Sequence, residues 1–327
     1  MRVRHATTGR WRLGLVLALM TMGAWATLPL ALKTALIYLD PYTLTWFRFL
    51  TAALVMGVWV ARRGRAPART GGRGAGVWWL LLAAAAMLTA NYVLYLLGLD
   101  LTTPAVAQVL IQLAPVLMAL GGIWLFGEHF SGTQWAGFLT LLAGLAVFFH
   151  RQLRTFAAGG DQFWHGALFI GGAAMAWAAY ALLQKQLLTD FSSDRIMLFI
   201  YLFAAVTLLS ASAPATLGAL DLTAWPIVGY CALNTLIAYG AFSEALNHWE
   251  ASRVSAVLAV TPLGTIAFGR LMAAIYPDAV PPERLDGLSL VGAGLVVAGS
   301  MATSLAGHRR RVRTGTATAD PVPNLEA

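Results

Sequence analysis

The chain has 327 residues, of which 59% are hydrophobic and 11% are charged, and its mean hydropathy is +0.69. Soluble domains carry about 25% charged residues, so this composition excludes a soluble domain and indicates that lipid is the main solvent. The net charge is +8, but the Lys and Arg residues cluster at the two chain ends and in one connection. That distribution is typical of an oriented membrane protein and not of a nucleic-acid partner.

Ten apolar runs divide the chain, each close to the length of about 20 residues that a helix needs to cross a bilayer. Two of them begin with a capping side chain followed by proline, at Asp40-Pro41 and Thr103-Pro104, which is typical of a helix start. We therefore predict ten transmembrane helices. Their spans are 12–34, 41–61, 75–98, 104–127, 132–149, 163–185, 194–213, 225–247, 252–275 and 286–306.

The two ends of the chain need separate interpretation. The basic residues before the first run resemble a secretory signal, but Leu13 to Leu32 is long enough to span and lacks a convincing small-residue cleavage site. We predict that this run is retained as the first helix, after a cytoplasmic tail of residues 1–11. Residues 307–327 contain no further apolar run, and we predict a disordered cytoplasmic tail there.

The positions of the basic residues predict the orientation. With a cytoplasmic N-terminus, sixteen Lys and Arg residues fall in segments on the cytoplasmic side, whereas the outside loops hold three, Arg151, Arg154 and Arg284. Positive residues collect in cytoplasmic loops, so we predict an integral membrane protein with both termini in the cytoplasm. The expected location is a bacterial plasma (inner) membrane.

Landmark residues recur at similar separations in the two halves of the chain, which indicates an internal repeat. The pairs, with separations of 152, 147, 147, 150 and 150 residues, are Trp25 and Trp177, Tyr92 and Tyr239, Pro115 and Pro262, Gly137 and Gly287, and Gly144 and Gly294. Glycines seven residues apart share a helix face, so we expect both glycine sets to let another helix approach closely in lipid.

An odd number of spans in each half inverts the second half relative to the first. The predicted fold is therefore an all-α polytopic membrane protein with ten transmembrane helices, arranged as two inverted five-helix repeats. The first repeat covers 12–149, the connecting loop 150–162, and the second repeat 163–306. This architecture favours alternating access.

Several short segments occur in an order and spacing that can be compared with known families. They are Gly23-Ala24-Trp25 with Lys33, Trp46 to Leu50, Leu110 to Pro115, Phe126-Gly127-Glu128, Gln134 to Gly137, and Ala259 to Pro262. Together they resemble the drug/metabolite transporter superfamily, specifically the EamA-type ten-helix transporters. The second half departs from the pattern, because Tyr276-Pro277-Asp278 replaces the Gly-Glu that usually follows.

The resemblance implies secondary transport, with export favoured, of a small metabolite such as an amino acid or a related amphipathic compound. Two five-helix bundles would rock about a central cavity by alternating access. Pro115 and Pro262 interrupt their apolar runs, so we expect a helix distortion at each.

Two arginines lie inside apolar runs, where a charge is costly unless it is paired or hydrated. Arg48 either attracts a substrate carboxylate from a cavity wall or has a structural role, bonding to helix ends or snorkelling outward. The structural role is favoured, because the Arg–Phe sequence matches a family motif that is found across many substrates. Arg270 lies near an outer helix end, where substrate contact and anchoring are equally supported.

Glu244 lies in the eighth run and shares a helix face with Tyr230 and Asn234. A membrane carboxylate can be protonated or ionised as its surroundings change, so Glu244 is a candidate for proton coupling. The alternative is an interfacial carboxylate paired with Arg253 or Lys185.

Neutral polar and aromatic side chains at membrane depth are further candidates for the lining of a substrate cavity. They are Trp25, Asn91, Tyr95, Gln108, Gln112, Trp177, Tyr180, Asn234 and Tyr239. For each amide the competing role, a hydrogen bond that joins two helices, is somewhat favoured, and for each aromatic residue the competing role is packing.

Signals for other chemistry are missing from the sequence. The six histidines lie at helix ends or in tails without metal-ligand spacing, and no nucleotide-phosphate loop appears. A single cysteine, Cys231, allows no disulfide within the chain. We predict no enzyme activity, no metal and no cofactor; the expected partners are a small-molecule substrate, membrane lipid and, with coupling, protons, and a homo-oligomer stays open.

Two other functions remain as alternatives to transport. An intramembrane enzyme acting on lipid-linked substrates would need a catalytic constellation. A non-transporting membrane sensor would keep the repeat while losing the cavity.

Overall fold

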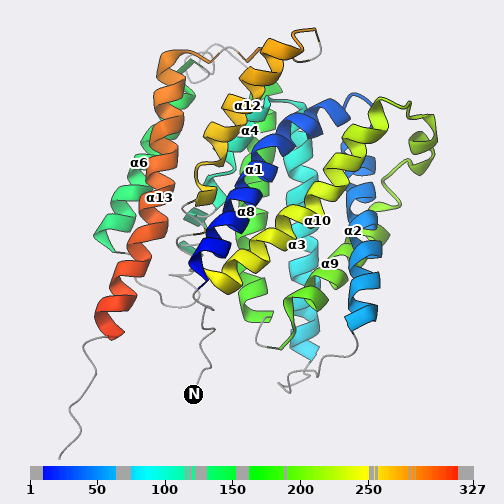
Figure 1. The fold of residues 1–327 in the computed structure, drawn as a ribbon, viewed down its shortest axis with the longest axis horizontal. Coiled ribbons are helices and arrows are strands. Elements are labelled where there is room, and N and C mark those ends of the chain that lie inside the picture. Colours follow the sequence, from blue (N-terminus) through cyan, green and yellow to red (C-terminus); the bar gives the residue numbers. More distant parts are fainter. Residues whose placement is uncertain are drawn as a thin grey trace, which may run out of the picture.

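The computed structural model describes most of the apolar part of the chain. The described residues are 10–63, 75–114, 116–117, 120–121, 131–151, 162–187, 190–249, 254, 257–278, 280, 282–283 and 285–315. All regular structure in these residues is helical (Figure 1). The elements are α1 (Trp11–Ala35), α2 (Pro41–Arg63), α3 (Ala75–Asp100), α4 (Pro104–Leu110), α6 (Gly132–Phe148), α8 (Gln162–Leu187), α9 (Ser193–Leu208), η1 (Pro214–Ala219), α10 (Ala224–His248), α12 (Thr261–Ile275) and α13 (Gly287–Gly315).

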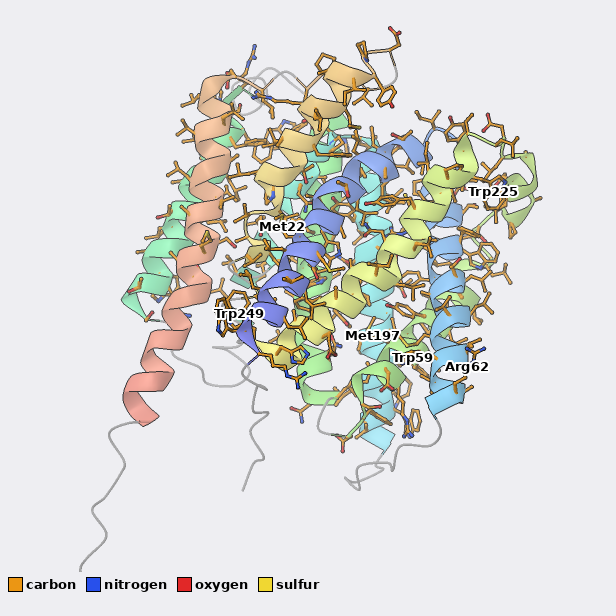
Figure 2. All side chains as sticks on the ribbon, viewed as in Figure 1. Met22, Trp59, Arg62, Met197, Trp225 and Trp249 are labelled. Atoms are coloured by element: carbon orange, nitrogen blue, oxygen red, sulfur yellow. The ribbon has the colours of Figure 1, made fainter. Side chains whose placement is uncertain are left out.

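The described helices present apolar side chains outward, as a lipid environment requires. By length and composition, α1, α2, α3 and α8 can cross a membrane, and α6, α12 and the first part of α13 are shorter apolar helices. Leu168 and Val206 are 73% and 72% exposed, which would be costly in water. Trp225 lies near the start of α10 and Trp249 just beyond its end (Figure 2). The Trp225 side chain is 39% exposed, which suits an indole at a membrane interface.

Helices of the first half pack mainly against helices of the second half. α1 packs against α10 and α12, α3 against α8 and α9, α2 against α9 and α10, α4 against α12, and α6 against α13. In chain order, the helices α1, α2, α3, α4 and α6 of the first half correspond to α8, α9, α10, α12 and α13 of the second half. The α1–α10 contact therefore corresponds to the α8–α3 contact, and the contacts α2–α9, α4–α12 and α6–α13 each join a helix to its own counterpart. Because α1 and α8 run in opposite directions (Figure 1), the packing has the pseudo-two-fold symmetry of inverted repeats.

The helices α6 and α13 approach each other through glycines. A Cβ atom added at Gly144 would lie 2.9 Å from the Gly292 carbonyl oxygen, and one added at Gly299 would lie 2.5 Å from the Gly137 carbonyl oxygen. Both distances are too short for a real Cβ atom, so these residues let the two backbones touch. Close backbone contact of this kind stabilises helix pairs in lipid.

The predicted pairing of glycines between the halves is wrong. An added Cβ at Gly287 or Gly294 would meet nothing within 4 Å, whereas Gly292 and Gly299 face α6. Gly292 follows Gly137 by 155 residues, and Gly299 follows Gly144 by the same number. The sequence spacing of seven was correct, but only the antiparallel packing decides which face of α13 meets α6.

Two of the predicted spans are interrupted. In the span 104–127, the regular helix α4 ends at Leu110 and a turn follows at residues 111–112. In the span 252–275, a turn at residues 259–260 precedes the start of α12. Each of these spans therefore contains a break in regular helix, and the second break immediately precedes Pro262, where the sequence analysis expected a distortion.

Proline accounts for the second interruption. A proline has no N–H group to donate to the carbonyl four residues earlier, which for Pro262 is the carbonyl of Leu258. Pro262 is the second residue of α12, and the hydroxyl of Thr261 donates to Leu258 O at 2.5 Å instead. Pro115, the predicted distortion in the first half, lies outside the described residues.

The predicted end of α9 at 213 is also wrong, because the helix stops at Leu208. Beyond it, the hydroxyls of Ser210 and Ser212 donate to backbone carbonyls of preceding residues, and Pro214 opens the short helix η1. Side-chain bonds to the local backbone compete with helix continuation.

The predicted end at 306 is too early, since α13 continues to Gly315. Residues 307–315 of the predicted tail are therefore helical, and residues 316–327 lie outside the described part of the chain. The start of α1 and the end of α13 lie on the same side of the bundle (Figure 1).

Candidate functional site

Arg48 lies in the interior of the helix bundle. Its side chain, from α2, is 3% exposed. Its Nε atom donates to Thr235 Oγ1 of α10 at 3.2 Å, and its guanidinium carbon lies 4.8 Å from the ring centroid of Tyr92 on α3. Helices of both halves therefore meet at this charge.

The charge of Arg48 is not balanced by an acidic side chain in the described part of the chain. The titratable groups within its electrostatic reach are Tyr92, Tyr95, Tyr201, Cys231 and Tyr239. Tyrosine and cysteine are neutral near pH 7. A desolvated cation–π contact contributes about 2 kcal/mol and a charged hydrogen bond about 1.5–3 kcal/mol, against a desolvation cost of several kcal/mol per ion.

Aromatic side chains from α1, α3, α8 and α10 gather beside Arg48. The rings of Tyr92 and Tyr239 stack with centroids 6.5 Å apart, and Trp25 meets Tyr239 edge-on at 5.5 Å. Trp177 and Tyr239 both pack against the buried core cluster that contains Tyr92. The structure thus brings together three of the predicted aromatic candidates, which are far apart in the sequence.

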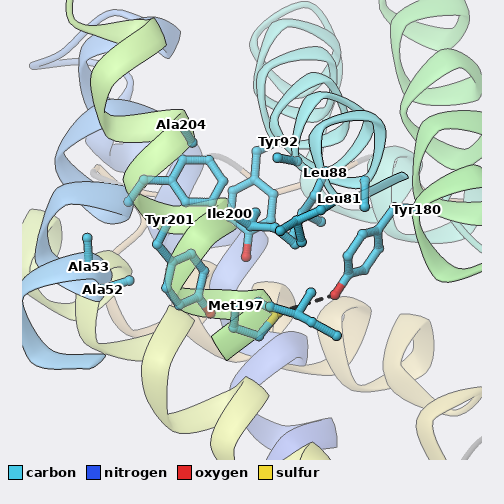
Figure 3. Close-up of a cluster of buried hydrophobic side chains, with 14 of the residues drawn as sticks. Ala52, Ala53, Leu81, Leu88, Tyr92, Tyr180, Met197, Ile200, Tyr201 and Ala204 are labelled. Carbon is cyan, nitrogen blue, oxygen red and sulfur yellow. Dashed lines mark hydrogen bonds between the residues drawn. The ribbon is translucent and has the colours of Figure 1, made fainter. Parts of the chain in front are cut away.

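Tyr180, the fourth aromatic candidate, lies in the apolar core next to this group. It is 3% exposed, and its hydroxyl donates to Met197 Sδ at 3.3 Å (Figure 3). Tyr201 of the same core is 1% exposed and packs against Phe49 with ring centroids 5.9 Å apart. The contacts of Tyr180 are those of a packing residue.

The amide candidates of α3 and α4 make bonds between helices. Asn91 Nδ2 donates to the Ala173 carbonyl of α8 at 2.8 Å, and the Tyr95 hydroxyl donates to Gln108 Oε1 of α4 at 3.1 Å. Such bonds join transmembrane helices and each contributes about 0.6 kcal/mol on average.

Gln112 connects the two helix interruptions. Its Nε2 atom donates to the Ala259 carbonyl at 3.2 Å. These residues are 147 apart, which is also the separation of Tyr92 and Tyr239. The turn of one half therefore touches its counterpart in the other, as the discontinuous helices of inverted-repeat transporters do.

Asn234 lies in the contact between α10 and α1. Its Nδ2 atom donates to the Ala24 carbonyl at 2.9 Å and to the Tyr230 hydroxyl at 3.0 Å, and that hydroxyl lies 2.5 Å from Thr27 Oγ1. Asn234 Oδ1 is buried and has no hydrogen-bond partner in the described structure. An unsatisfied buried acceptor costs about 1–3 kcal/mol.

The two remaining charged candidates are exposed, unlike Arg48. Arg270 reaches the Leu285 carbonyl at 3.5 Å, which is a long contact for a hydrogen bond. Glu244 is 54% exposed, and its Oε1 atom lies 3.0 Å from Nε2 of His248 one turn along α10. Arg253 and the side chain of Lys185 lie outside the described residues, so the predicted Glu244 pairs stay predictions.

The sequence reasoning missed two residues of this site. Tyr92 was noted only as a repeat landmark, and Thr235 was not noted. Tyr92 follows the candidate Asn91, and Thr235 follows the candidate Asn234. Neighbouring positions in a helix point in directions about 100° apart, so a polar neighbour gives no signal that a residue faces Arg48.

Outside the spans, a carboxylate joins the α12–α13 connection to the start of α4. Thr103 Oγ1 donates to Glu283 Oε2 at 3.0 Å, and the Ala105 N–H donates to Oε1 at 3.2 Å. Burial raises the pKa of Glu283 from its ordinary value, and these hydrogen bonds oppose that rise. Throughout the described ranges, no group of three or more His, Cys, Asp or Glu side chains is placed to hold a metal ion.

Comparison with known proteins identifies the family. The model of the EamA-like transporter family matches residues 12–150 and again residues 164–305. The chain belongs to the EamA-like transporter family. The predicted family and the predicted all-α polytopic membrane fold are therefore confirmed.

This chain matches proteins named as transporters over nearly their whole length. The uncharacterized inner membrane transporter YhbE of Escherichia coli strain K12 is 36% identical over 91% of this chain and 92% of its own. An uncharacterized transporter of Haemophilus influenzae is 34% identical over 91% of this chain and 96% of its own. A more distant E. coli relative, 25% identical over 87% of this chain and 92% of its own, is named "Probable amino-acid metabolite efflux pump".

A solved crystal structure of a protein shares the fold. It matches with a TM-score of 0.60 over 91% of this chain and 98% of its own, at 19% sequence identity. At that identity the likeness shows the arrangement of helices alone.

Proposed function

We propose that this EamA-like protein is a secondary transporter of the bacterial inner membrane that exports small amphipathic metabolites, such as amino acids, by alternating access. The observation that carries the proposal is the group of Arg48, Tyr92, Tyr239, Trp25 and Trp177 in the interior, contributed by helices of both halves. A cation beside aromatic rings suits a solute with one charged and one apolar part. The E. coli relative named as an amino-acid metabolite efflux pump supports this solute class.

Residues 12–149 and 163–306 would act as the two moving units. Their contacts exchange under the pseudo-two-fold relation, so a rocking motion can open either side of the same central group. The turns at residues 111–112 and 259–260, joined by Gln112, are where the helices can bend without breaking a regular hydrogen-bond ladder.

Export is tested by comparing metabolites outside cells that overproduce the protein with those outside cells that lack it. We expect a small amphipathic compound to accumulate outside the producing cells and to be transported by the purified protein in proteoliposomes. The proposal is contradicted if no compound is enriched and the purified protein moves none of the compounds tested.

Proton coupling through Glu244 is a second part of the proposal. The Oε1 atom of Glu244 lies 3.0 Å from Nε2 of His248, so a carboxylate and an imidazole are adjacent on α10. Glu244→Gln should abolish proton-driven accumulation in proteoliposomes while substrate exchange, which needs no net proton movement, continues. Accumulation by stable Glu244→Gln protein with unchanged pH dependence would exclude this coupling role.

The orientation with both termini in the cytoplasm is also proposed, from the distribution of basic residues and from the shared side of the α1 start and the α13 end. Reporter fusions at Arg69 and Leu220 should report opposite sides of the membrane. Access to both positions from one side would contradict the inverted arrangement.

A further inference from the structure

The guanidinium group of Arg48 is fixed at one of its three nitrogen atoms. Nε donates to Thr235 Oγ1, while the two terminal Nη atoms donate to no residue in the described structure. The residue as a whole is 3% exposed. Both Nη atoms therefore keep hydrogen-bond donors that no described residue uses.

The contacts of Arg48 differ from those of an arginine that stabilises a helix bundle. A structural arginine in a membrane uses its terminal nitrogens on helix-end carbonyls or on a carboxylate, or extends them to the interface. Lys33 shows that behaviour here, since its ammonium group donates to the carbonyls of Leu99 and Asp100 at the end of α3. Arg48 is buried and makes neither kind of bond with the described residues.

Thr235 and Tyr92 restrict how the guanidinium group can lie. The hydroxyl of Thr235 holds Nε, and the ring of Tyr92 lies 4.8 Å from the guanidinium carbon. Two parallel Nη donors held in this way match the two oxygens of a carboxylate. Tyr92 also stacks with Tyr239, which contacts Trp25, so an apolar surface continues from the cation.

We propose that Arg48 is the anion-binding residue of the transport site and that the substrate carries a carboxylate next to an apolar or aromatic part. The carboxylate would bind the two Nη atoms, and Thr235 would act as a positioning residue. The inference rests on the proposed function, and it narrows the substrate class from amphipathic metabolites to organic acids, including zwitterionic ones.

The test is binding of radiolabelled 3-phenylpropionate to the full-length protein in lipid nanodiscs, with empty nanodiscs subtracted. Unlabelled 3-phenylpropionate and its neutral amide serve as competitors of equal shape. We expect the acid to compete about 10- to 100-fold better than the amide, which is the effect of one strong charge-assisted interaction. Equal competition by the two compounds, or no saturable binding of the acid, would overturn the proposal.

Variants separate recognition from folding. Arg48→Met should remove the preference for the acid, and Arg48→Lys, which keeps the charge but loses the planar pair of donors, should retain part of it. Arg12→Met is the matched control, because Arg12 is an exposed arginine at the start of α1. Preference for the acid in folded Arg48→Met protein would overturn the proposal.

Thr235 provides a test that does not depend on the stability of the Arg48 variants. Thr235→Val removes the hydroxyl that holds Nε at nearly constant volume, and we expect acid binding to weaken about 3- to 10-fold with little change for the amide. Thr235→Ser keeps a hydroxyl and should restore binding. Equal acid binding by the Val and Ser variants would contradict the positioning role.

The same protein also separates this inference from the proposed function. If the wild-type protein exports a metabolite and 3-phenylpropionate does not compete with that export, transport stands and the anion subsite is wrong. If the acid binds through Arg48 but no solute is moved, the subsite stands and the transport proposal fails.

Discussion

The contact between α3 and α8 and the contact between α1 and α10 occupy equivalent places in the two halves, yet they are built differently. At one end the equivalence is close: a Cβ at Gly166 would meet Thr102 at 2.6 Å, and a Cβ at Gly14 would meet Trp249 at 2.4 Å. Gly14 precedes Gly166 by 152 residues and Thr102 precedes Trp249 by 147, the separations of the tryptophan and tyrosine landmarks.

One turn further into the bundle the two contacts differ in how they fill the same space. In the α3–α8 contact, Gly98 faces Ile170, and an added Cβ would lie 2.5 Å from the Ile170 side chain. The equivalent positions in the α10–α1 contact are Ala245 and Ala18, both fully buried. Glycine opposite isoleucine and alanine opposite alanine are two ways to bring the helices together in lipid.

The polar chemistry is even less symmetric. Asn91 of α3 donates to the Ala173 carbonyl of α8, whereas at the equivalent positions Thr21 of α1 donates to the Ala238 carbonyl of α10 at 3.4 Å. The position equivalent to Arg48 in the second half, 152 residues later, is Ile200, a fully buried apolar residue. The repeat therefore preserves helix packing, and the charge that we assign to substrate binding belongs to one half.

The largest effect is expected from a glycine in the tighter contact. Gly98→Ala should lower the free energy of unfolding by about 1–3 kcal/mol, because the new methyl group would meet Ile170 and the Gly166 carbonyl oxygen, and overpacking has that cost. The measurement is unfolding of the purified protein by SDS titration.

Gly240 of α10 is the matched control for Gly98. An added Cβ at Gly240 meets nothing within 4 Å, so Gly240→Ala should leave stability unchanged or raise it by up to about 1 kcal/mol through helix propensity. Equal destabilisation by the two substitutions would show that the two contacts are equally tight.

An intermediate effect is expected from the two buried asparagines. Asn91→Ala should lower the free energy of unfolding by about 0.6–1.7 kcal/mol through loss of its interhelical bond. Asn234→Ala should cost less, because it also removes the buried Oδ1 atom that lacks a partner. The same SDS titration compares them, and a larger loss for Asn234→Ala would mean that Oδ1 is satisfied in the membrane.

The smallest effect is expected at Glu283, which joins the end of the α3–α8 region to the α12–α13 connection. Burial raises the pKa of Glu283, so the folded protein holds this proton more tightly than the unfolded chain does. Its contribution to stability is therefore complete below the ordinary glutamate pKa and decreases as pH rises through the raised value. Glu283→Gln should flatten this part of the curve of unfolding free energy against pH. If Glu283→Gln leaves the dependence of unfolding free energy on pH unchanged, that dependence arises from other groups.

Much of the fold is predictable because it depends on local properties of the chain. Apolar runs of about 20 residues and capped starts such as Thr103-Pro104 identify helices directly, and the starts at 41 and 104 match the structure. The error in the glycine pairing occurs where a local signal has a long-range meaning. The sequence selected Gly287 and Gly294, whereas Gly292 and Gly299 are the glycines of α13 that contact α6. The proline at 262 marks a break in its apolar run, but the contact between the two breaks through Gln112 is visible only in the structure.

By itself, the sequence determined that lipid is the solvent, that the chain repeats, and that an arginine in the second span needs an explanation. These conclusions need no tertiary structure, because hydropathy and residue spacing are properties of the linear sequence. Only the tertiary structure decided what Arg48 touches. Its partner Thr235 is 187 residues away, and whether a hydroxyl, a ring or a carboxylate faces the guanidinium group depends on how α2, α3 and α10 rotate against one another. That rotation is set by side-chain packing between the halves, which no single segment contains.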